Sequence, residues 1–185
     1  MEPYRIILFL HLLSMIGLFV GYGLEWTGTA FLLGSKTGEE ARGSLRIYRA
    51  SLPLSGPSLI VLILSGGYMA GVTGVSKEGW LIASVLGIVV ALGMGFGLVM
   101  PRMRALRNTL PEGNTALVGP ALAKVQDAFV PTLIRARFFL ALGIVFVMTT
   151  KPMLVSSLAV LFGGMMVGIL ASATTWPKPG ERQTA

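Results

Sequence analysis

The sequence predicts an all-α polytopic membrane protein, a single bundle of five transmembrane helices. Hydrophobic residues make up 54% of the chain and charged residues only 12%, about half the charged share of an ordinary soluble domain. Five apolar stretches are each long enough for a hydrocarbon core of about 30 Å, which a helix crosses in roughly 20 residues. Because the chain has no cysteine, disulfides, zinc–thiolate sites and iron–sulfur clusters are excluded.

The first predicted span, residues 6–34, is the only one whose middle carries both an imidazole and a carboxylate. Spacings of four, three, four and three residues align five side chains of this span on one helical face. They are His11, Met15, Leu18, Tyr22 and Glu25. Since polar groups are unfavourable next to lipid, we expect this face to point toward the other helices.

The polar segment after the first span, residues 35–51, predicts a short amphipathic surface helix, because Arg42, Arg46 and Arg49 share one face. The remaining predicted spans cover residues 53–74, 80–100, 133–150 and 153–175. The predicted bundle therefore occupies residues 1–176, and residues 177–185 form a flexible cytoplasmic tail.

Prolines and turn residues set the expected limits of the later elements. Pro101 is expected to end the third span, and residues 111–114, PEGN, read as a turn. An amphipathic helix over residues 116–130 is then expected to lie at the membrane surface. Pro131 is expected to kink that helix into the fourth span.

Basic residues are distributed unequally between the two sides that five spans define. One side receives 12 and the other only Arg5, Lys77 and Lys151, out of 15 in total. By the positive-inside rule, the N-terminus lies outside and the C-terminus in the cytoplasm. The net charge of +7 is thus explained by orientation and by anionic lipid, with no need for nucleic acid. We expect a multi-pass protein of a bacterial inner membrane.

Small residues recur at intervals that allow helices to approach closely. The pairs are Gly17 with Gly21, Gly67 with Gly71 and Gly164 with Gly168, and a longer row contains Gly87, Ala91 and Gly95. Such rows favour packing inside the bundle, and they also suit a contact with another membrane subunit or a second copy of the chain.

Three segments carry a family resemblance: HLLSMIGLFVGYG (11–23), SGGYMAG (65–71) and RFFLALGIVFVMTTKP (137–152). Over most of residues 5–152 the chain resembles a bacterial family of predicted integral membrane proteins, and the fifth span extends beyond the usual core of that family. More remotely, the early histidine is similar to that of the copper-resistance D and HemJ-type protoporphyrinogen oxidase families. This second resemblance implies copper or haem at His11, although the chain lacks a second histidine for bis-histidine haem ligation.

The predicted orientation gathers the only imidazole and four thioethers in one layer near the outer surface. They belong to His11, Met15, Met69, Met148 and Met153. Imidazole with thioether is a ligand set for Cu(I), and a His/Met pair is also an axial set for the iron of haem b. Alternatively, the methionines only fill space and His11 bonds a neighbouring helix. A zinc site is not expected, since this layer lacks carboxylates.

Glu25 is the second candidate site. An ionisable group inside a bilayer indicates proton or ion transport, or else a structural ion pair. Arg135 and Arg137, at the cytoplasmic start of the fourth span, are the expected partners for such a pair.

Three functions therefore stand open: haem or copper binding for electron transfer or metal handling, an accessory or scaffold role in a larger membrane complex, and small-ion transport through Glu25. The motifs of soluble nucleotide-binding enzymes, metalloproteases and serine hydrolases are missing from the sequence.

Overall fold

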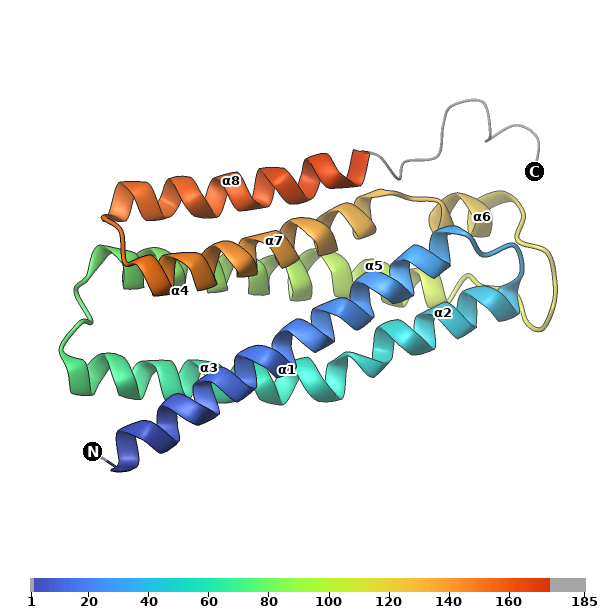
Figure 1. The fold of residues 1–185 in the computed structure, drawn as a ribbon. Coiled ribbons are helices and arrows are strands. Elements are labelled where there is room, and N and C mark those ends of the chain that lie inside the picture. Colours follow the sequence, from blue (N-terminus) through green and yellow to red (C-terminus); the bar gives the residue numbers. More distant parts are fainter. Residues whose placement is uncertain (1, 174–185) are drawn as a thin grey trace.

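The computed structural model describes residues 2–173, which form helices joined by turns (Figure 1). Five helical segments are long and apolar enough to cross a membrane: Pro3–Leu33, Gly38–Thr73, Gly79–Arg107, Gly119–Thr150 and Leu154–Ala173. The predicted class, an all-α polytopic membrane protein with five spans, is confirmed. The predicted flexible tail, residues 177–185, lies outside the described residues.

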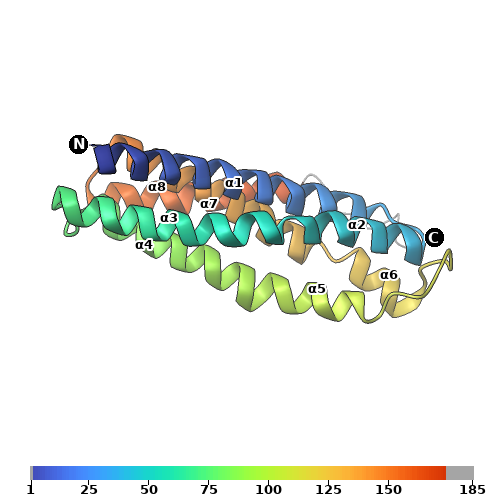
Figure 2. The ribbon, with the colours of Figure 1, turned by 90° about the horizontal axis from the view of Figure 1, so that it is seen from below.

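The first helix, α1 (Glu2–Leu33), packs antiparallel to α2 (Gly38–Ala50) and α3 (Leu52–Thr73), which follow one another nearly in line (Figures 1 and 2). The 36 residues of Gly38–Thr73 would measure about 54 Å at 1.5 Å per residue. That length exceeds a hydrocarbon core of about 30 Å, so α2 extends beyond it. Helix α2 is the predicted short amphipathic helix, and its buried face includes Ala41, Leu45 and Tyr48.

The third span is one continuous rod made of α4 (Gly79–Leu92), the π-helix η1 (Gly93–Val99) and α5 (Met100–Arg107). The prediction that Pro101 ends this helix is therefore wrong. Within the π-helical turn, the N–H of Met100 donates to the carbonyl of Gly95, five residues earlier. The wider turn relieves the clash between a proline ring and the preceding turn that breaks a regular α-helix.

The segment after α5 also differs from expectation. Between residue 116 and the start of α7 (Phe129–Thr150), only Gly119–Val125 is helical, and it forms α6. Ala116 is extended and forms an isolated bridge with Thr37, which stops a helix from starting there. Pro131 lies in the first turn of α7, where a missing N–H removes no helical hydrogen bond, so the predicted kink is also wrong.

Helix α7 is the centre of the bundle. Of its apolar stretch 61% is buried, against 28% or less in each of the other four spans. It packs against α8 (Leu154–Ala173), α4, α1 and η1. The exposed large apolar side chains of α1, α3, α4 and α8 form the lipid-facing surface expected of a membrane bundle.

Two of the three predicted glycine pairs lie at helix contacts. A Cβ added at Gly164 would lie 2.8 Å from the carbonyl oxygen of Phe139, and one at Gly168 would lie 2.6 Å from Cα of Ala136. Gly17 and Gly21 similarly face the serines of α3. A Cβ added at Gly67 or Gly71, by contrast, would meet no atom of the described residues within 4 Å, so this pair faces outward.

The bundle has two unlike ends, which we name from the charge bias. The outer end carries the start of α1, the α3–α4 turn and the α7–α8 turn; the inner end carries the α1–α2 and α5–α6 connections (Figure 1). The inner end holds its own hydrophobic core, which includes Leu32, Leu45, Met103, Leu117 and Val125. This core fastens α2, α5 and α6 onto the membrane-spanning helices.

Candidate functional site: an outer cavity and an inner ion pair

A cavity of about 390 Å³ opens at the outer end between α1, α3, α4 and α7. Apolar side chains dominate its walls. The polar groups are His11 in the interior and Tyr4, Thr73, Thr149 and Lys151 among the other lining residues. A mostly apolar cavity with few convergent polar groups is the usual form of a ligand site.

His11 is anchored to α3 through one ring nitrogen. Its Nδ1 lies 3.0 Å from Oγ of Ser65, and that Oγ lies 2.5 Å from the carbonyl oxygen of Val61. Since the serine proton is directed to the carbonyl, Nδ1–H is the donor and Oγ its acceptor. The Nε2 atom then keeps its lone pair, which is the form in which histidine binds a metal ion.

Four of the five sulfur and nitrogen ligands predicted from the sequence line this cavity. His11, Met15, Met69 and Met148 all contribute to its walls. Met153 does not, because it lies in the α7–α8 turn with 85% of its surface exposed. Among residues 2–173, no group of three or more His, Cys, Asp or Glu side chains is placed to hold a metal ion, so the donor set is of the soft type.

A smaller apolar cavity of about 60 Å³ lies deeper in the bundle and shares His11, Met15 and Met148 with the outer cavity. Tyr22 also lines it. The predicted face of α1 thus runs along both cavities and ends at the charged residues described next, and Leu18, Tyr22 and Glu25 on that face are buried.

Glu25 and Arg137 form an ion pair inside the bundle, where Arg137 Nη2 donates to Glu25 Oε2. Only 4% of Glu25 and 7% of Arg137 are exposed. The hydroxyl of Ser51 lies 3.3 Å from the other carboxylate oxygen, and the guanidinium lies 4.8 Å from the ring centroid of Tyr22. The pair is therefore surrounded by groups that stabilise both charges.

Arg135 is buried in a different environment. Its guanidinium lies 5.2 Å from the ring centroid of Trp26, and its Nη1 donates to the carbonyl of Ala171 at 3.3 Å. This arginine therefore links α7 to α8 as well as to α1. Of the two arginines expected beside Glu25, the structure joins Arg137 to the carboxylate.

The π-helix gives Arg137 the space it needs. A Cβ at Gly95 would meet Nη1 of Arg137, so the glycine lets the guanidinium lie against η1 without a shift of the side chain. π-Helical turns occur often at functional sites. The glycines at positions 93, 95 and 97, just before Pro101, are the sequence signal that could have indicated this turn.

Sequence reasoning missed Ser65 and Ser51, the partners of His11 and Glu25. Ser65 lies on α3, where a serine side chain commonly bonds the carbonyl four residues earlier, and Ser51 lies at the junction of α2 and α3. Ser65 does so with Val61, and a second role toward another helix leaves no trace in the spacing.

Comparison with known proteins assigns the family. Residues 5–152 match the family described as Predicted integral membrane protein (DUF2269). The chain belongs to this family. The match covers α1 to the end of α7, so α8 lies beyond it. No curated protein and no solved structure matches the chain, and the remoter similarity to the copper-resistance D and HemJ-type families gains no support from these comparisons.

Proposed function

We propose that this multi-pass membrane protein binds Cu(I) in the outer cavity, in a metal-handling role. The observation that carries the proposal is one cavity lined by an imidazole and the thioethers of Met15, Met69 and Met148. The hydrogen bond from His11 Nδ1 to Ser65 supports it further, because it leaves Nε2 as the ligand atom.

The chemistry of the donors favours Cu(I) over harder ions. Thioether sulfur is a soft ligand that selects Cu(I), whereas Zn²⁺ and Mn²⁺ require more imidazole, thiolate or carboxylate. Cu(I) also carries a single charge, which lowers the penalty for holding it among neutral ligands inside a bilayer.

The charge bias supports access of Cu(I) to the cavity from the outer side of the membrane. Arg5, Lys77 and Lys151 are the basic residues of the outer end, and eight described basic residues occupy the polar segments at the inner end. In a bacterial inner membrane, the positive-inside rule would open the cavity toward the periplasm. Cu(I) could then be taken from that side without crossing the hydrocarbon core.

The test is a Cu(I) titration of the purified chain in detergent against a chromophoric Cu(I) chelator. We expect one Cu(I) per chain, and a fall in affinity of about 10–100-fold in His11→Ala and in Met148→Leu. Met153→Leu, outside the cavity, is the matched control and should bind as the parent does. Failure of the parent to bind, or equal losses in the control, would overturn the proposal.

Haem b is the second candidate for the same cavity. The apolar walls suit a porphyrin, and the ammonium group of Lys151 lies where it could pair with a propionate. His11 with one methionine would supply the axial ligands of an electron-transfer haem. A Soret band in the purified protein that is lost in His11→Ala would favour haem, and a colourless preparation would exclude it.

An accessory role in a larger complex is favoured by the outward-facing glycines of α3, Gly67 and Gly71. Copurification of a partner in fixed ratio from mild detergent would support this role.

Ion transport through Glu25 would need its pair with Arg137 to open, and flux in liposomes that survives Glu25→Gln would argue against it.

A further inference from the structure

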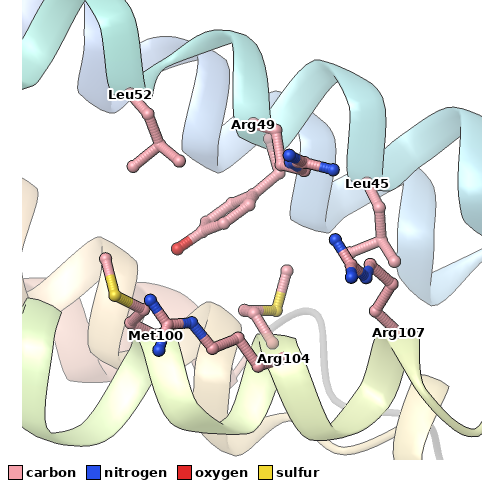
Figure 3. A pocket seen from close by; sticks show the side chains of 8 residues that line it. Leu45, Arg49, Leu52, Met100, Arg104 and Arg107 are labelled. Carbon is pink, nitrogen blue, oxygen red and sulfur yellow. The ribbon is translucent and has the colours of Figure 1, made fainter.

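A separate cavity of about 300 Å³ lies at the inner end. One side is formed by α2 and the first residue of α3, and the other side by α5. Figure 3 shows Arg49 on one wall and Arg104 and Arg107 on the other. All three arginines are exposed. Arg49 lies on α2 and the other two lie on α5, and these two helices belong to different spans of the chain. Three guanidinium groups therefore meet around one hollow that the sequence alone does not assemble.

Two other arginines of the inner end have structural roles that these three do not share. Arg42 donates to the carbonyls of Leu110 and Pro111, and Arg102 lies over the ring of Phe129 at 4.4 Å. Within residues 2–173 no carboxylate forms an ion pair with the three arginines of the cavity. Their combined positive charge is therefore available to an anion.

The remainder of the cavity is apolar and lies at the level where the chain becomes hydrophobic. Leu52 is the first residue of α3 and Met100 the first of α5, and both line the hollow together with Leu45 and Met103. Tyr48 adds a phenolic donor to the same lining. A ligand here would meet positive charge on the cytoplasmic side and apolar surface on the membrane side.

We propose that this cavity binds the phosphate group of an anionic phospholipid from the cytoplasmic leaflet. Guanidinium groups form paired hydrogen bonds with phosphate oxygens, which are stronger than bonds between neutral groups. The apolar side chains would contact the glycerol and the first part of an acyl chain. A soluble phosphate compound shares the headgroup chemistry, but it would leave the apolar part of the cavity without a partner.

The test measures lipid binding to the full chain in detergent by native mass spectrometry, with phosphatidylglycerol as the probe and phosphatidylcholine as the neutral reference. We expect phosphatidylglycerol to bind more tightly, and its affinity to fall about tenfold in Arg104→Gln and again in the double variant with Arg107→Gln. Arg46→Gln is the matched control, since Arg46 is exposed on α2, the helix that carries Arg49, and lies outside the cavity lining.

Three results would overturn the proposal. One is equal binding of the two lipids, and another is a loss in Arg46→Gln as large as in Arg104→Gln, which would show only a general surface charge. The third is full competition by inorganic phosphate at the concentration of the lipid, which would assign the cavity to a soluble phosphate compound. Unfolding temperatures of all variants should match the parent, because the substituted side chains are exposed.

Discussion

The outer and inner halves of the bundle accommodate buried polar groups in opposite ways. In the outer half, His11 bonds Ser65 on α3 and also faces an open, mostly apolar cavity. In the inner half, Glu25 and Arg137 neutralise one another, and Ser51, Tyr22 and a glycine of the π-helix close around them. The two polar sites share one face of α1, yet only the outer one leaves space beside its polar atoms.

This difference indicates where a ligand can bind. A charge buried in a bilayer must find a partner within the protein, and Glu25 and Arg137 are partners for each other. A neutral imidazole can be buried with one nitrogen unbonded at a smaller penalty. The inner pair is thus explained by stability, and the outer cavity keeps donor atoms for a ligand.

The largest expected effect comes from breaking the inner pair. Arg137→Met leaves the Glu25 carboxylate buried without its partner, and we expect the free energy of unfolding to fall by about 3–5 kcal/mol. Removing both charges in Glu25→Leu with Arg137→Met should destabilise the protein less than the single change, because no unpaired charge remains. Denaturant unfolding in detergent, followed by circular dichroism, measures both.

An exposed carboxylate provides the reference for that comparison. Glu39→Gln on α2 should change the free energy of unfolding by no more than about 0.5 kcal/mol, since Glu39 is exposed. If Arg137→Met lowered the free energy of unfolding as little as Glu39→Gln does, the inner pair would not be a stabilising contact. The contrast between the two halves would then fail.

Much of this arrangement follows from the sequence. The apolar lengths predict five spans, and the spacing of His11, Met15, Leu18, Tyr22 and Glu25 predicts which face of α1 points inward. Both depend on local periodicity, which the chain carries within one helix. The glycine pairs of α1 and α8 likewise mark real helix contacts, because a backbone can approach only where side chains are small.

The parts that could not be predicted depend on contacts between helices. Arg135 and Arg137 are two residues apart, and only the rotation of α7 decides which one meets Glu25. The continuation of the helix through Pro101 depends on a π-turn that Arg137 fills from another helix. Met153 shares a membrane level with the other methionines, but the direction of the α7–α8 turn keeps it out of the cavity.

Two glycine substitutions, with effects of intermediate size, test how the packing of helices differs between the halves. In the inner half, Gly168→Ala would place a methyl group 2.6 Å from backbone atoms of α7, and we expect a loss of about 1–3 kcal/mol as α8 shifts. Gly67→Ala on α3 meets no described atom within 4 Å, so it should be neutral or stabilise the helix by up to about 1 kcal/mol. Unfolding midpoints give both values, and similar losses at the two sites would contradict the packing described here.

The smallest expected change in stability tests the outer half. Ser65→Ala removes the acceptor for His11 Nδ1–H, and we expect the free energy of unfolding to fall by only about 0.5–1.5 kcal/mol, since open cavity lies beside the ring. The imidazole then loses the bond that fixes its tautomer, so Cu(I) affinity should fall more than stability does. Ser76→Ala in the exposed α3–α4 turn should change neither quantity. Unchanged Cu(I) affinity in Ser65→Ala, with loss in His11→Ala, would mean that the histidine is oriented by some other contact.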